Sequence, residues 1–236
     1  MKKLFICTAI TGVLLSCGPS RFVDPLKRGE QAFSGSLGGP IINVPGIASI
    51  PIPFTSLTYG KGLTDNTTLY GSWFSTAAIF GTFQFELGAT HRLWKDEENT
   101  RGLSITPAFN IGTDKFEWNT KIWPQLDMNY YWKYNWKHQT QDELLNHVSK
   151  VPNMLYAGIG SWYELAGKRA HDLPQSTRVV PMLQVGHDLN WKSWTFSTEL
   201  KVLAPFTSNE NVVTDYKSIL GRYGATGLYI GLTKRF

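Results

Sequence analysis

Apolar and polar residues alternate along most of the chain, in segments separated by polar or Gly/Pro/Asn-containing turns. A period of two puts successive side chains on opposite faces of a strand, so this alternation predicts β-structure. Strands are predicted over residues 31–41, 53–62, 68–79, 82–93, 102–112, 121–135, 153–165, 178–190, 194–205 and 224–236. Because most have the length of a tilted membrane strand, the predicted fold is all-β: a single antiparallel up-and-down transmembrane β-barrel of about 10 strands.

The two faces of these strands differ in polarity. Phe83, Phe85 and Leu87 share one face of their strand, whereas Gln84 and Glu86 lie on the other. A soluble barrel also alternates in this way but hides its apolar face, so alternation alone leaves open which face is outside.

Charged residues in mid-strand favour an apolar outside and a polar lumen. Glu86, Asp127, Glu199 and Lys201 would be very costly in the apolar core of a soluble protein. We expect them near the membrane midplane, with Arg92 and Lys133 lower and with Glu164 and Arg178 meeting near the outer rim. A structural network of ion pairs and hydrogen bonds is favoured over a selectivity ring, because a barrel of this size is largely filled by its own side chains.

Composition supports strands that meet lipid. Aromatic residues make up 14% of the chain and charged residues only 17%, and aromatics crowd strand ends, as in residues 130–136. The net charge of +5 is too mild to indicate nucleic-acid binding. After Leu15, no apolar stretch approaches the length of a membrane helix.

The N-terminus has the pattern of an export signal. Two lysines precede the apolar run Leu4–Leu15, which ends on Leu14-Leu15-Ser16-Cys17. This motif resembles the lipobox of bacterial lipoproteins, which implies fatty acylation (such as palmitate) of Cys17 as the new N-terminus. The alternative is an ordinary signal peptide with Cys17 as a bystander. The predicted organisation is a lipoprotein signal peptide at 1–16, a periplasmic linker at 17–30 and the barrel at 31–236.

The last strand runs to the end of the sequence, with Leu228, Ile230, Leu232 and Phe236 on one face. It resembles the C-terminal signature of bacterial outer-membrane β-barrel proteins, from which Lys234 departs. The resemblance implies an outer-membrane location. With an even number of strands both termini are expected on the periplasmic side, where the acylated Cys17 would anchor the chain.

Two connections stand out. In residues 136–152, Thr140-Gln141-Asp142-Glu143 predicts a capping box that opens a short helix, which either docks a partner or covers the barrel mouth. The apolar, proline-rich connection at 42–52 predicts a contact surface or a lid.

The sequence offers little chemistry. None of the histidines, at 91, 138, 147, 171 and 187, has a metal-binding spacing, and no nucleotide fingerprint is present. We therefore expect no metal site, no cofactor and no enzymatic activity. The predicted function is a structural or accessory subunit of an outer-membrane complex, whose partners are membrane lipid and other membrane proteins rather than nucleic acid. The alternatives are a narrow channel, a lipid-modifying enzyme and a periplasmic lipoprotein that binds an apolar ligand.

Overall fold

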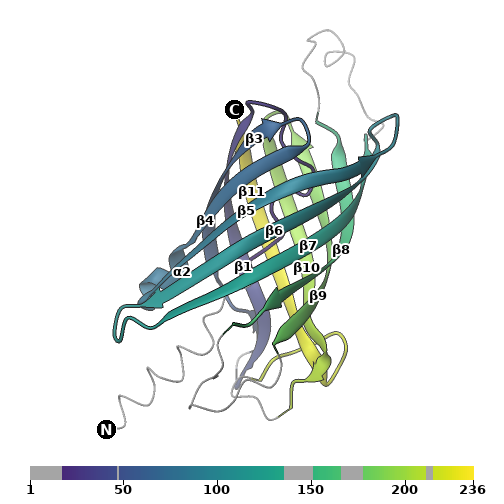
Figure 1. Cartoon of the computed structure of the whole chain (residues 1–236). Helices are drawn as coiled ribbons and strands as arrows, with labels where there is room; N and C mark the ends of the chain where they lie inside the picture. Colours follow the sequence, from purple (N-terminus) through teal and green to yellow (C-terminus); the bar gives the residue numbers. More distant parts are fainter. Residues whose placement is uncertain (1–17, 47, 136–150, 166–177, 211–214) are drawn as a thin grey trace.

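The computed structural model describes residues 18–46, 48–135, 151–165, 178–210 and 215–236. Within these residues ten strands form a closed antiparallel barrel (Figure 1). They are β1 (Gln31–Val44), β3 (Thr55–Thr64), β4 (Thr67–Phe74), β5 (Thr82–Lys95), β6 (Arg101–Asp114), β7 (Thr120–Tyr134), β8 (Asn153–Tyr163), β9 (Val179–Trp191), β10 (Trp194–Ser208) and β11 (Tyr223–Arg235). The predicted fold class is confirmed.

The first and last strands close the barrel. Each strand pairs with its neighbour in sequence, and β1 pairs with β3 on one edge and with β11 on the other. The pairing with β11 runs from Ala32 opposite Arg235 to Pro40 opposite Gly227. Phe236 continues it, because its N–H donates to the carbonyl of Gln31 at 2.8 Å. The chain therefore pairs up to its final residue.

Two short elements depart from the prediction. The predicted strand at 68–79 ends early, because β4 stops at Phe74 and the helix α2 (Ser75–Ile79) follows. The connection at 42–52 contains the strand β2 (Ala48–Pro51), which pairs only with the end of β1. This hairpin extends the wall of the barrel beyond its rim.

Several sequence predictions fall outside the described residues. They are the signal peptide, the acylated Cys17 and the helix within 136–152, of which only the last two residues are described. No helix in the described part of the chain has both the length and the apolar character needed to cross a membrane.

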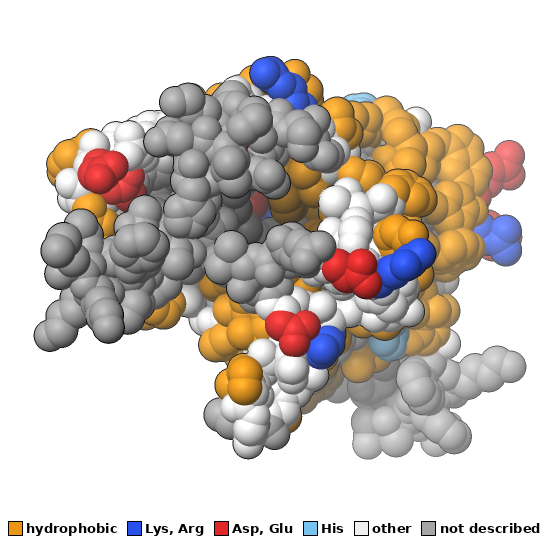
Figure 2. Space-filling view, turned by 90° about the horizontal axis from the view of Figure 1, so that it is seen from below, with side chains coloured by type: hydrophobic (Ala, Val, Ile, Leu, Met, Phe, Trp, Pro, Cys, Tyr) orange, Lys and Arg blue, Asp and Glu red, His pale blue; other side chains and the backbone are white. Residues whose placement is uncertain are grey.

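The outer wall of the barrel is apolar and the inner wall is polar. Leu87 and Ile159 are each 60% exposed on the outside, whereas Thr90 and Ser104 are fully buried on the inside. Figure 2, which looks onto one end of the molecule, shows hydrophobic side chains continuing along the flank of the barrel. A soluble barrel has the opposite arrangement, so this wall is built to face lipid.

The two ends of the barrel differ in their connections. The C-terminal rim carries Phe236 and the tight turns at 65–66 and 192–193. The opposite end, here called the far rim, carries α2, β2 and the turn at 115–119, and the two ends are visible in Figure 1.

A charge on the apolar wall tests this arrangement. Leu87 lies near the middle of β5, so we expect Leu87→Arg to destabilise the folded barrel by about 2–4 kcal/mol, because arginine is costly at the bilayer midplane. Urea unfolding in liposomes, followed by gel mobility without boiling, measures the difference. Leu63→Arg is the matched control, since Leu63 is 50% exposed close to the C-terminal rim and should lose little stability. Equal losses at both positions would contradict a lipid-facing wall.

Candidate functional site

The lumen contains the chain's own N-terminal segment, residues 18–26. Near the far rim, the carbonyl of Gly18 accepts a hydrogen bond from Lys201 Nζ at 3.0 Å. At the other end, the N–H of Leu26 donates to Thr68 Oγ1 at 2.7 Å, next to the C-terminal rim. Residues 27–30 then turn back along the rim and lead into β1, where Gly29 N–H donates to the carbonyl of Gly62 at 2.9 Å.

This path differs from the predicted linker at 17–30. The segment lies inside the barrel, where Arg21, Val23 and Leu26 are at most 6% exposed. Two prolines, Pro19 and Pro25, keep the segment out of regular pairing, since proline lacks the N–H that a strand ladder needs. Its backbone groups are instead bonded to side chains of the wall.

The wall is shaped to receive the segment. A Cβ at Gly60 would lie 2.5 Å from the ring of Phe22, and a Cβ at Gly62 would lie 2.0 Å from the carbonyl oxygen of Lys27. Both glycines are on β3, and any larger residue there would collide with the segment. Phe22 itself has a φ of 45°, a left-handed conformation that a bulky residue adopts only under constraint.

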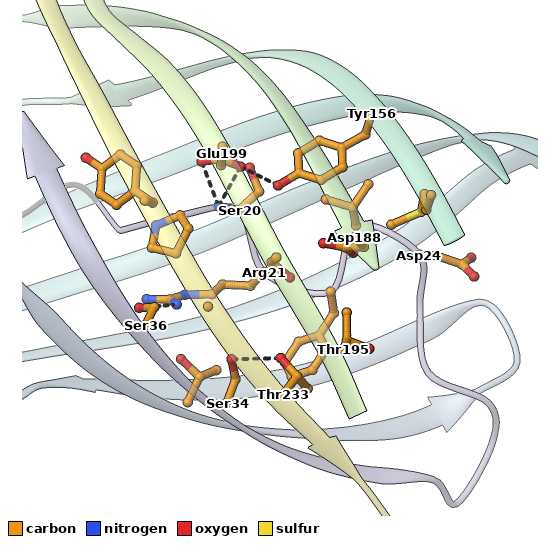
Figure 3. Close-up of a pocket in the computed structure, with 18 of the residues that line it drawn as sticks. Ser20, Arg21, Asp24, Ser34, Ser36, Tyr156, Asp188, Thr195, Glu199 and Thr233 are labelled. Atoms are coloured by element: carbon orange, nitrogen blue, oxygen red, sulfur yellow. Dashed lines mark hydrogen bonds between the residues drawn. The ribbon is translucent and has the colours of Figure 1, made fainter. Parts of the chain in front are cut away.

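Glu199 forms the first polar cluster on the segment. Its carboxylate accepts hydrogen bonds from the Ser20 N–H at 3.1 and 3.2 Å and from the hydroxyl of Tyr156 at 2.8 Å (Figure 3). Lys201 Nζ lies 3.3 Å from the same carboxylate, and both side chains are almost wholly buried. The ion pair on β10 is thus joined to the backbone of the segment at Gly18 and Ser20.

Arg21 forms the second cluster. Its guanidinium donates to Ser56 Oγ at 2.8 Å and to Ser36 Oγ at 3.4 Å, and its Nε lies 3.9 Å from the carboxylate of Glu86. Tyr70 donates a further hydrogen bond to Glu86 at 2.8 Å. The Arg21 side chain is 5% exposed, so this charge depends on partners from β1, β3 and β5.

Asp24 forms the third cluster, close to the C-terminal rim. Its carboxylate lies 2.7 Å from Arg92 Nη2 on β5 and 2.8 Å from Lys133 Nζ on β7. Between the second and third clusters, Val23 packs with Tyr131, Met154 and Tyr156. The segment is therefore held by charge at three levels and by apolar contact in between.

The predicted lumen residues take different places in this arrangement. Glu86, Glu199 and Lys201 all contact the N-terminal segment. Asp127 is buried on the same inner wall and accepts from Gln125 Nε2 at 2.7 Å. Glu164 and Arg178 meet through their backbones, since the Glu164 N–H donates to the Arg178 carbonyl at 2.7 Å, while the Arg178 residue is exposed.

The sequence analysis missed the residues of the segment itself. Arg21 and Asp24 belong to the site, as does Tyr156, which bonds Glu199. One signal was available: two opposite charges stand among the apolar residues Phe22, Val23 and Leu26, which is unusual for a solvated linker.

A cavity lies beside the segment. It has a volume of about 50 Å³ and lies between the segment and the wall formed by β9, β10, β11 and β1. Ser34, Ser36, Thr195 and Thr233 give it a hydroxyl-rich lining (Figure 3). This volume suits a few water molecules rather than a substrate.

Carboxylates in the connections stabilise turns. Asp96 accepts from the hydroxyl and N–H of Thr100 and from the N–H of Arg101, and these bonds hold the pKa of Asp96 below its ordinary value. Asp215 accepts from the side-chain amide of Asn43 at 2.9 Å, which together with Lys217 lowers the pKa of Asp215. Both carboxylates therefore remain charged at neutral pH.

Candidate catalytic groups are scattered. His187 shares a hydrogen bond of 2.6 Å with the hydroxyl of Tyr134, and His91 shares one of 2.9 Å with Thr67. Among the residues that the structure describes, no group of three or more His, Cys, Asp or Glu is placed to hold a metal ion.

Comparisons with known proteins give distant structural matches only. Neither a family model nor a curated protein matches the chain. An outer-membrane channel from Pseudomonas putida F1 is 12% identical with a TM-score of 0.45, covering 92% of this chain and 99% of its own. The NanC porin is 7% identical with a TM-score of 0.42, covering 86% and 98%, and LpxR from Salmonella typhimurium is 11% identical with a TM-score of 0.40, covering 93% and 80%.

Because the TM-scores of these matches are below 0.5, they add no argument to the evidence from the barrel wall. The chain folds as a small β-barrel of the outer-membrane type. That conclusion depends on the closed sheet, the apolar outside and the polar, filled inside.

Proposed function

We propose that this protein is an outer-membrane β-barrel lipoprotein that is closed to solutes and acts as a structural or accessory subunit of a membrane complex. The observation that carries this proposal is the N-terminal segment, which occupies the lumen and is bonded to the wall at three levels. A barrel of ten strands encloses a narrow lumen, and residues 18–26 lie in the space that the wall side chains leave. With the segment seated, we expect no continuous aqueous path through the lumen.

The orientation in the membrane follows from the connections. Barrels of this type have short periplasmic turns. Two connections at the C-terminal rim, 65–66 and 192–193, have only two residues, although the longer connection at 135–152 lies at the same rim. We therefore assign this rim to the periplasm and the far rim to the cell surface.

The segment supports a proposal about where a lipid anchor on Cys17 would meet the membrane. Cys17 is bonded to Gly18, whose carbonyl contacts Lys201 inside the barrel. Residues 18–26 fill the lumen between Gly18 and the C-terminal rim. An acyl group on Cys17 would thus meet lipid at the cell-surface rim while the segment is seated, rather than on the periplasmic side. Mass spectrometry of the purified N-terminal peptide, with Cys17→Ser as the control, tests the acylation itself.

Purification under native expression in mild detergent tests the subunit role. We expect the protein to elute in a complex larger than the monomer with its detergent. Cross-linking in intact membranes before extraction should give the same assembly. A strictly solitary monomer in both measurements would contradict the proposal.

A gated channel is the second candidate. Its support is that the segment contacts the wall mainly through ion pairs and hydrogen bonds, which water can replace if the segment leaves. The inner wall behind it carries hydroxyls, such as those of Thr58, Thr90 and Thr106, which a hydrated lumen would require.

A further inference from the structure

Asp24 lies between two cations of the barrel wall. Its Oδ1 is 2.7 Å from Arg92 Nη2, and its Oδ2 is 2.8 Å from Lys133 Nζ. The two cations come from β5 and β7, which are separated by β6, and their side chains are only 8% and 9% exposed. Each carboxylate oxygen therefore has its own cationic partner.

The wall holds these cations in place independently of Asp24. Arg92 Nε donates to the hydroxyl of Tyr131 at 3.0 Å, and Arg92 Nη1 donates to Asn66 Oδ1 at 3.1 Å. Lys133 Nζ lies 5.3 Å from the centroid of the Tyr131 ring. All these wall partners are neutral, so they orient the two charges without compensating them.

The compensating charge comes from the N-terminal segment. In the part of the chain that the structure describes, Asp24 supplies the carboxylate that lies within 4.0 Å of both Arg92 and Lys133. Two largely buried cations point toward the position of the Asp24 carboxylate. They strongly favour an anion at that position, because an uncompensated buried charge is costly. A planar guanidinium beside an ammonium group favours an oxyanion with two oxygens to bond.

The site is accessible from the C-terminal rim. The Asp24 side chain is 23% exposed, and the segment reaches the rim within three residues, where Lys27 and Arg28 are exposed.

We propose that Arg92 and Lys133, with Tyr131 and Asn66 behind them, form an oxyanion-binding site for carboxylate or phosphate groups. Asp24 is its tethered occupant, and a free oxyanion binds there once that carboxylate is removed. The inference rests on the proposed closed barrel and goes beyond it, because it makes the seating of the N-terminal segment sensitive to anions at the C-terminal rim.

Cysteine labelling tests the site by anion rescue. Val23 is 3% exposed, so in a background without the two native cysteines (Cys7→Ala and Cys17→Ser) a Val23→Cys side chain reacts with a maleimide only when the segment leaves the lumen. We expect Asp24→Ala to raise the labelling rate by about tenfold or more through loss of two charge-assisted bonds. Inorganic phosphate or acetate should slow labelling again, whereas chloride at the same ionic strength should not.

Three comparisons make the test specific. Glu97→Ala removes an exposed carboxylate at the same rim and should leave the labelling rate unchanged. Adding Arg92→Gln and Lys133→Gln to Asp24→Ala should abolish the rescue. In phosphatidylcholine nanodiscs without added phosphate, slowing by phosphatidylglycerol identifies a lipid headgroup as the source of the oxyanion, and slowing by added phosphate alone identifies a free anion.

The proposal is overturned if no oxyanion slows labelling of the Asp24→Ala protein, or if the slowing persists without Arg92 and Lys133. This outcome is distinct from failure of the proposed function. A parent protein that labels rapidly at Val23→Cys and conducts ions would reject the closed barrel itself.

Discussion

A variant that lacks residues 19–26 is expected to conduct ions in discrete steps across planar bilayers, whereas the parent protein stays silent. The deletion removes Arg21, Phe22, Val23 and Asp24 from the lumen and leaves a wall lined by hydroxyl and charged groups. Such a wall holds water, so an ion path opens where the segment lay. Because ten strands enclose a narrow lumen, the steps should be small compared with those of a porin.

Two controls accompany the conductance measurement. Lys61→Ala changes an exposed residue on β3 and should be as silent as the parent. A synthetic peptide with the sequence of residues 18–26 should block the steps of the deletion variant from one side of the bilayer. Steps of equal size in the parent protein would contradict a closed lumen, as would a deletion variant that is folded by gel mobility and still silent.

Replacing Arg21 is expected to cause the largest loss of stability from one substitution in the lumen. Arg21→Met keeps the length of the side chain but removes the donors to Ser36 and Ser56 and the cation beside Glu86. Glu86 is then a buried carboxylate that keeps only the hydroxyl of Tyr70 among the partners described above. We expect the free energy of unfolding to fall by about 3 kcal/mol, because removing one partner of a buried pair leaves the other charge uncompensated.

Urea unfolding in liposomes measures this loss, and a double variant isolates its cause. Glu86→Gln combined with Arg21→Met should recover part of the stability, since the uncompensated carboxylate is gone. Arg101→Met, at an exposed position on the C-terminal rim, should change stability by less than about 0.5 kcal/mol. Additive losses in the double variant would show that Arg21 and Glu86 do not interact.

The strands could be predicted well because their signal is local. In the segment around Leu87, every second residue is apolar, and this pattern alone places Phe83, Phe85 and Leu87 on one wall and Glu86 on the other. The closing strand carries the same information up to Phe236, which pairs with Gln31. A one-residue shift would invert both faces, so the pattern fixes which residues point to the lumen.

Some local features still escaped the pattern. The strand predicted at 68–79 included Ser75–Ile79, which the structure forms as α2. Alternation does not mark the end of the strand at Phe74, because a short apolar run is compatible with a strand or with a helix.

By itself, the sequence determined an all-β barrel with an apolar outside, its strand order and the inward position of Glu86, Asp127, Glu199 and Lys201. Only the tertiary structure decided that residues 18–26 lie inside that barrel. The segment has no periodic pattern, and its partners are far away in sequence: Ser20 bonds Glu199, and Asp24 bonds Arg92 and Lys133. Those partners come together only when the strands close, so the two charges among apolar residues could suggest that the segment is buried but could not identify its partners.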